Sequence, residues 1–186
     1  MKSKKNKKIK NQRFLKHSSF QRKSKCGQMK LSFGMIFSII LIVIFIAFAF
    51  WGVKKFLAYQ NKLQIGQFIT YIQEDIDKMA RSFEGSSEQS YALPKKVEYL
   101  CFTDFTKPSK GPNATFYNDF QLVSNGEKNN MFFYPLESAE GIESVKIEKI
   151  DIVNITSQSN PYCISNEGGI TLIIKKDIGE NLVKIQ

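Results

Sequence analysis

Acidic residues are missing from the first thirty positions of this chain, and charged residues of either sign are missing from the next twenty-three. The first thirty positions hold twelve of the 27 lysines and arginines, so the remaining 15 cations face 17 acidic residues. The formal net charge of +10 therefore combines a tail of +12 with a remainder of −2. Such an asymmetry indicates a basic interaction tail rather than a basic folded domain.

Histidine is almost absent, since His17 in the basic tail is the only one. The rest of the chain therefore cannot form a Ser/His/Asp triad, a Cys/His pair or a histidine-ligated zinc site. The glycines form no phosphate-cradling motif. No pair stands out by its spacing among the carboxylates Asp75, Asp77, Asp104, Asp119, Glu137, Glu140 and Asp151. We therefore predict that the chain is not an enzyme and binds no metal or cofactor.

The uncharged run covers residues 31–53 and predicts a transmembrane helix. At about 1.5 Å per residue it would extend about 34 Å, which exceeds the roughly 30 Å of a bilayer's hydrocarbon core. Trp51 and Tyr59 suit an aromatic belt at the exit from the membrane. Two alternatives are a buried core helix and a secretory signal cleaved after Ala47-Phe-Ala49, although the run is long for either.

The cations before the uncharged run predict the orientation of the chain. Basic residues beside a membrane helix stay on the cytoplasmic side, and the twelve before the run outnumber Lys54, Lys55 and Lys62 after it. We expect residues 1–30 to form a disordered cytoplasmic tail that contacts anionic lipid head groups of the cell membrane. Few aromatic residues accompany these cations, so no specific nucleic-acid partner is expected.

Residues 54–84 carry the pattern of an amphipathic helix that continues from the membrane. Apolar side chains recur every three or four positions, which places them on one face. They are Ile65, Phe68, Ile69, Ile72, Ile76, Met79 and Phe83. The first strong stop signal is Gly85-Ser86-Ser87, and Gly66 is the expected place for a bend. The apolar face needs a partner, and a sheet formed by the residues that follow would supply it.

From Tyr91 onward, short segments alternate between apolar and polar residues with a period of two. Residues 85–186 are therefore predicted to form an extracytoplasmic domain built on one small antiparallel sheet. Strands are expected around Val97 to Cys101, at 131–134, over Ser144 to Ile155 with a bulge or break between Ile147 and Ile150, and over Ile170 to Ile174. A hairpin closed by residues 166–169 would join Tyr162 to Ile174. The predicted fold class is therefore α+β, with one long N-terminal helix followed by a small antiparallel β-sheet domain.

The three cysteines divide between the two predicted sides of the membrane. Cys26 lies in the tail, where thiols stay reduced, whereas Cys101 and Cys163 both fall in the outer domain and are predicted to form a disulfide. Two separate buried thiols are the alternative. The outer domain also contains two N-glycosylation patterns, at Asn113 and Asn154. Chance matches to this pattern are common, and Asn154 is expected to lie within a strand.

The junction between tail and helix reads Lys25-Cys26-Gly27-Gln28. It resembles the class III signal of archaeal type IV pilin-like proteins, in which a basic leader precedes a long apolar helix and a β-rich head. The resemblance implies cleavage by a prepilin peptidase between Gly27 and Gln28, followed by self-association through the apolar helix. The alternative is an uncleaved membrane-anchored module that binds a partner through its outer domain and forms no filament.

Overall fold

The structure is a computed structural model that describes residues 33–124, 126 and 128–186. The chain comprises two compact units, residues 1–43 and residues 44–186. In the first unit the described residues, 33–43, are α-helical throughout and solvent-exposed. The predicted cytoplasmic tail, with Gly27 and Gln28, lies outside the described residues.

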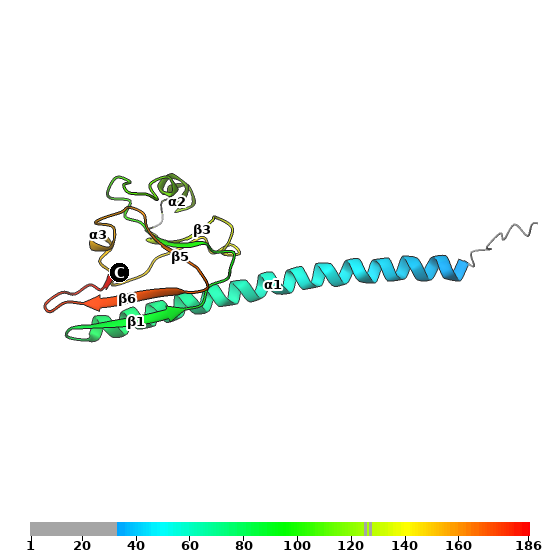
Figure 1. Cartoon of the computed structure of the whole chain (residues 1–186), viewed down its shortest axis with the longest axis horizontal. Helices are drawn as coiled ribbons and strands as arrows, with labels where there is room; N and C mark the ends of the chain where they lie inside the picture. Colours follow the sequence, from blue (N-terminus) through cyan, green and yellow to red (C-terminus); the bar gives the residue numbers. More distant parts are fainter. Residues whose placement is uncertain (1–32, 125, 127) are drawn as a thin grey trace, which may run out of the picture. The chain divides into compact units, whose positions relative to one another are not determined.

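The N-terminal helix α1 (Phe33–Arg81) covers the described part of the uncharged run, residues 33–53, and most of the predicted amphipathic segment (Figure 1). The helix continues through Gly66 without interruption and ends four residues before Gly85. The amphipathic stripe is confirmed, because four of its residues are at most 2% exposed: Ile65, Phe68, Ile72 and Ile76. Phe83 lies beyond the helix end and is 76% exposed, so its assignment to the stripe was wrong.

Residues 85–186 form two antiparallel sheets rather than the single sheet expected. The three-stranded sheet has the order β1-β6-β7 and the four-stranded sheet has the order β4-β3-β2-β5. Their strands are β1 (Gly85–Tyr91), β2 (Tyr99–Phe102), β3 (Met131–Tyr134), β4 (Ser144–Val145), β5 (Tyr162–Ser165), β6 (Ile170–Lys176) and β7 (Lys184–Ile185). The α+β fold class is therefore confirmed, with two short sheets beside the helix.

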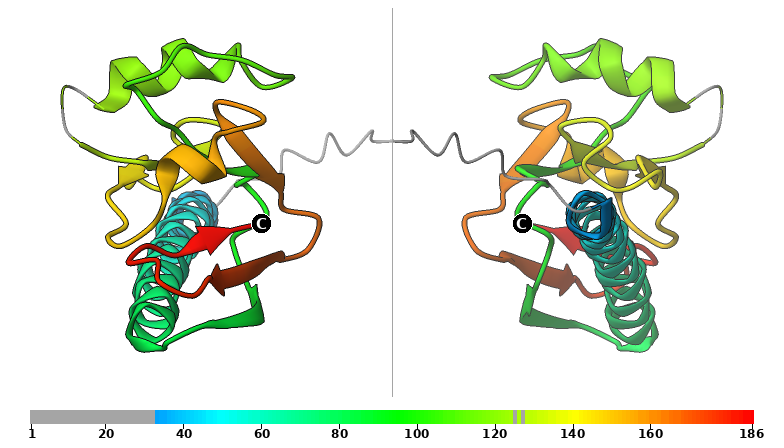
Figure 2. Two further views of the ribbon diagram at one scale, coloured as in Figure 1. Left: turned by 90° about the vertical axis from the view of Figure 1, so that its left-hand side faces the viewer. Right: turned by 90° about the vertical axis from the view of Figure 1, so that its right-hand side faces the viewer.

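Alternation along β2 and β3 gives the four-stranded sheet two buried faces. Leu100 and Phe133 join the α1 stripe and the three-stranded sheet in the main core. Cys101 and Phe132 face the other way and join Phe120 of helix α2 (Phe116–Ser124) in a second core. Figure 2 shows α2 and the C-terminal half of α1 on opposite sides of this sheet. Because both faces are buried, residues 131–134 carry large apolar side chains at every position instead of alternating with polar ones.

The predicted hairpin between Tyr162 and Ile174 is wrong, because its two strands belong to different sheets. β5 pairs with β2, whereas β6 pairs with β1. The Asn166 side chain fixes the crossing, since its amide donates to the carbonyls of Pro94 and Val97 at 3.1 and 2.7 Å. The chain turns at Gly169, whose φ is +142°. A turn signal alone does not tell a hairpin from a crossing between sheets.

The segment from Ser144 to Ile155 is also not one strand. Pairing ends after the two residues of β4, and Lys149 adopts a φ of +62°, which produces the break expected between Ile147 and Ile150. The chain then forms the short helix α3 (Ile152–Ile155). Asp151 caps this helix by accepting a hydrogen bond from the Asn154 amide at 3.0 Å. Asn154 therefore lies on a helical turn and not in a strand.

Candidate functional site

The N-terminal part of α1 presents a large uninterrupted apolar surface. No residue in the described positions 33–53 is charged, and the most apolar 18-residue window has a mean hydropathy of 3.0 with none of its residues buried. Phe45 and Phe48 are each 68% exposed to solvent. Soluble proteins rarely leave contiguous apolar patches of this size uncovered. This helix is therefore long and apolar enough to cross a membrane, the only such helix in the described chain.

The polarity of α1 changes just after this apolar part. Lys54 and Lys55 are its first described cations, and both are exposed. Asn61 then donates a hydrogen bond to Glu140 at 3.4 Å, and Ile65 is the first fully buried residue. The uncharged apolar surface of α1 therefore ends between Val53 and Asn61, and Trp51 and Tyr59 lie on either side of the two lysines in the sequence.

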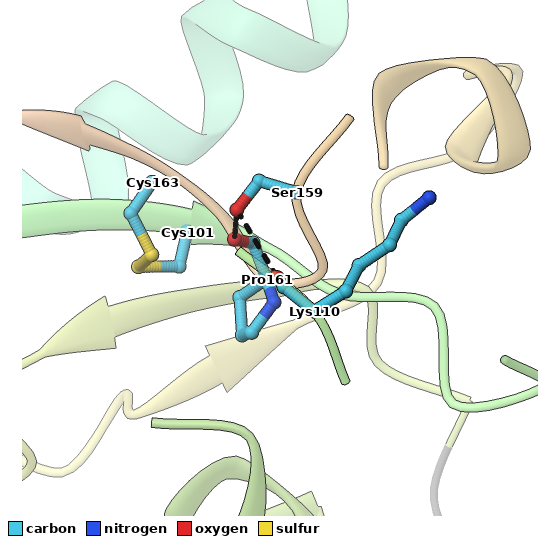
Figure 3. Close-up of a disulfide and its surroundings, with 5 residues drawn as sticks. All are labelled: Cys101, Lys110, Ser159, Pro161 and Cys163. Carbon is cyan, nitrogen blue, oxygen red and sulfur yellow. Dashed lines mark hydrogen bonds between the residues drawn. A yellow bond between two sulfur atoms is a disulfide. The ribbon is translucent and has the colours of Figure 1, made fainter. Parts of the chain in front are cut away.

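The disulfide between Cys101 and Cys163 is present, as predicted (Figure 3). The two residues are direct partners in the pairing of β2 with β5, and their Cα atoms are 4.0 Å apart. Cys101 is fully buried in the second core, beside Phe132 and Phe120. The bond therefore joins two neighbouring strands under the layer formed by α2.

The loop before α2 is fastened to the segment that leads into β5. Lys110 and Asn160 form a two-residue bridge through their backbone N–H and C=O groups, with both N···O distances 2.9 Å. Ser159 donates from its hydroxyl to the carbonyls of Pro161 and Lys110 (Figure 3). Gly111 has a φ of +87°, and a Cβ there would lie 2.5 Å from the Ser159 hydroxyl oxygen. Only glycine fits this position.

The two glycosylation patterns occupy different surroundings. Asn154 is exposed on α3, but the hydroxyl of Thr156 in the same pattern is buried and donates to the Ile152 carbonyl at 2.7 Å. Asn113 is half-buried in the turn before α2, where its carbonyl accepts from the Phe116 amide at 3.0 Å, and Thr115 is exposed. Modification of either asparagine stays a prediction.

Two of the carboxylates noted in the sequence form ion pairs. The Lys149 ammonium lies 3.0 Å from Asp77, and its hydrogen bond lowers the pKa of that carboxyl. Lys96 lies 2.7 Å from Glu140 and lowers the pKa of Glu140 in the same way. Among the described residues, none of the other carboxylates in that group forms an ion pair. Within residues 33–124, 126 and 128–186, no three His, Cys, Asp or Glu side chains gather as metal ligands would.

A buried tyrosine joins α1 to the first strand. The Tyr91 hydroxyl donates to Asp75 at 2.7 Å, and its ring meets the Phe68 ring edge-on with centroids 5.4 Å apart. Burial, reinforced by the Asp75 carboxylate, raises the pKa of Tyr91 far above its ordinary value. Tyr91 therefore stays neutral and holds β1 against the helix.

Two features of this domain carried little signal in the sequence. Helix α2 was not predicted, although Phe116 and Phe120 are spaced four residues apart and stack on Tyr134 and Phe132 with centroids 3.9 and 4.7 Å apart. That spacing was the available clue. Strand β1 was not predicted either, because its sequence Gly-Ser-Ser-Glu-Gln-Ser-Tyr has low strand propensity.

Comparison of the chain with protein-family models, with curated proteins and with solved structures found no match.

Proposed function

We propose that the chain is a single-pass membrane protein whose tail lies in the cytoplasm and whose residues 85–186 lie outside, where it serves as a pilin-like or other structural subunit of the cell envelope. The observation that carries this proposal is the uncovered apolar part of α1. Burying that surface in hydrocarbon removes an unfavourable contact with water, and beyond the first turn of α1 the backbone groups form hydrogen bonds within the helix.

Charge and redox chemistry support the proposed orientation. The twelve cations of residues 1–30 precede the helix and favour retention of the tail inside. Disulfides form and persist in oxidising environments, outside the cytoplasm. The bond between Cys101 and Cys163 therefore suits a domain outside the membrane.

Assembly through α1 is supported by apolar surface that continues beyond the proposed membrane segment. Leu63 and Tyr71 are each at least half exposed. Both line a hollow of about 570 Å³ between α1 and the loop at Ile142. A helix from a neighbouring subunit would cover such a surface, so the pilin-like proposal explains why it is exposed in a single chain.

A second candidate is an uncleaved membrane-anchored module that binds a partner and forms no filament. Lys30 favours this candidate, because it places a charge three residues beyond the proposed cut, inside the segment that a pilin-like assembly would bury. The two candidates share their topology and differ in the N-terminus of the mature chain.

The intact mass of the chain extracted from membranes separates the two candidates. The pilin-like proposal predicts that the wild type and Gly27→Ala both begin at Gln28, because the family's leaders end in Gly or Ala, whereas Gly27→Val keeps its leader. Full-length mass for all three proteins would overturn the pilin-like proposal and leave the anchored module.

A further inference from the structure

Strand β1 is an edge strand with one side unpaired along its whole length. It pairs with β6 over all seven residues, from Gly85 opposite Lys176 to Tyr91 opposite Ile170. It stands at the end of the order β1-β6-β7, and no described residue pairs with its other side (Figures 1 and 2). An edge of this kind offers backbone groups to another chain.

The pairing of β6 with β7 identifies those backbone groups. Ile173 exchanges hydrogen bonds of 2.9 and 3.0 Å with Gln186, so its N–H and C=O point towards β7. Successive residues of a strand point to opposite sides, so Leu172 and Ile174 point towards β1. Their partners Gln89 and Ser87 consequently point back at β6. The N–H and C=O groups directed away from the sheet therefore belong to Ser86, Glu88 and Ser90.

Several features that protect other edge strands are missing from β1. The strand contains no proline, no lysine and no bulge, and its register is unbroken. The opposite edge of the same sheet is covered, because Val183 accepts from the Asp151 amide at 2.8 Å and donates to the Lys149 carbonyl at 2.9 Å. In the four-stranded sheet the outer strands β4 and β5 are only two and four residues long.

Two open cavities lie between α1 and β1. One of about 190 Å³ is lined by Asp75, Lys78 and Met79 of the helix with Ser87 and Gln89 of the strand. The other, of about 210 Å³, is lined by Gln67, Phe68 and Tyr71 with Ser90 and Tyr91. Ser87 and Tyr91 are four residues apart, or about 13 Å along a strand. Side chains four residues apart on an added strand lie on the same face and would match this spacing.

Glu88 is the only charged residue of β1, and Glu84 lies just before the strand. Glu84 and Glu88 are both exposed, and neither makes an ion pair within the described part of the chain. Two copies of β1 paired antiparallel in full register would place Glu88 opposite Glu88, which is unfavourable. The charge of Glu88 therefore disfavours a second copy of β1 and favours a partner strand with a cation opposite Glu88.

We propose that the free edge of β1 binds an extended, basic peptide segment of another protein, which adds to the three-stranded sheet as a fourth strand. The backbone groups of Ser86, Glu88 and Ser90 form its ladder, and a Lys or Arg of the partner faces Glu88. The two cavities receive its side chains that point towards α1. This proposed binding site does not depend on whether the leader is cleaved.

The test uses the full chain in detergent micelles and a fluorescein-labelled peptide, Thr-Val-Thr-Lys-Thr-Val-Thr, with fluorescence anisotropy as the readout. Ser90→Pro removes an outward N–H, a change that an edge strand tolerates. Ser90→Ala is the matched control, because both variants lose the 3.0 Å contact between the hydroxyls of Ser90 and Thr171 but only the first loses the N–H. Melting curves check that both variants fold.

The proposal predicts that Ser90→Pro weakens peptide binding by roughly tenfold or more, through the lost hydrogen bond and the intruding ring. Ser90→Ala binds as the wild type does. Glu88→Gln weakens binding of the lysine peptide by about two- to fivefold, and a peptide with Glu in place of Lys binds more weakly than the lysine peptide to the wild type.

Three results would overturn the proposal. One is the absence of binding by the lysine peptide up to about 1 mM, the weakest affinity that this assay resolves. Another is equal loss of binding in the proline and alanine variants. The third is self-association of the wild type in light scattering that Ser90→Pro abolishes and Ser90→Ala keeps, because the edge would then pair with a second copy of this chain.

Discussion

Packing of the amphipathic half of α1 against both sheets can be tested at Ile72. This side chain is fully buried among the α1 stripe and the strands of the main core. Ile72→Ala removes three carbon atoms, worth about 2.4 kcal/mol at about 0.8 kcal/mol each, and leaves a cavity that adds to the loss. We expect the free energy of unfolding to fall by about 3 to 4 kcal/mol.

The assay is urea unfolding of the full chain in micelles, followed by near-ultraviolet circular dichroism of the aromatic residues in the two cores. With a slope of about 2 kcal/mol per molar urea, the midpoint of Ile72→Ala should fall by about 1.5 to 2 M. Tyr71→Ala is the matched control on the same turn of helix, because Tyr71 is 54% exposed, and its midpoint should barely move. Equal shifts for the two variants would refute the burial of this helix face.

Two further predictions concern the disulfide and an ionic cluster. Replacing Cys101 and Cys163 together with alanine should cost about 4 kcal/mol of unfolding free energy, since the bond closes a separation of 62 residues, and urea midpoints unchanged from the oxidised wild type would contradict this. Hydrogen bonds from Lys175 and Lys184 lower the pKa of Asp177 to about 2, so its contribution is present above about pH 4 and lost as the pH falls towards 2. Asp177→Asn should remove that part of the acid destabilisation, and an unaltered stability profile between pH 4 and 2 would count against it.

The sequence predicted the elements whose signal is local and periodic. The stripe from Ile65 to Ile76 repeats every three or four residues, and four of its members are buried as expected. The aromatic run at 131–134 matches β3 residue for residue. The disulfide could be predicted because Cys101 and Cys163 are the only two cysteines in the folded domain, which was expected to lie in an oxidising compartment.

Long-range pairing was beyond what the sequence could settle. The turn at residues 166–169 resembles a hairpin turn, and only the hydrogen bonds from Asn166 to Pro94 and Val97 send β6 to a different sheet. Strand β1 has few strand-forming residues and depends on β6 for its shape. The unpaired edge of β1 follows from sheet order, so it could not be predicted from residue types.

The proposed topology is tested most directly by measuring on which side of the membrane the folded domain lies. Gln121 is exposed on α2, so Gln121→Cys can be labelled in intact cells with a membrane-impermeant maleimide and the product located by mass after digestion. We expect labelling of position 121 in intact cells, on a chain that stays in the membrane fraction after alkaline carbonate washing. Labelling only after lysis, or release of the chain into the wash, would contradict it.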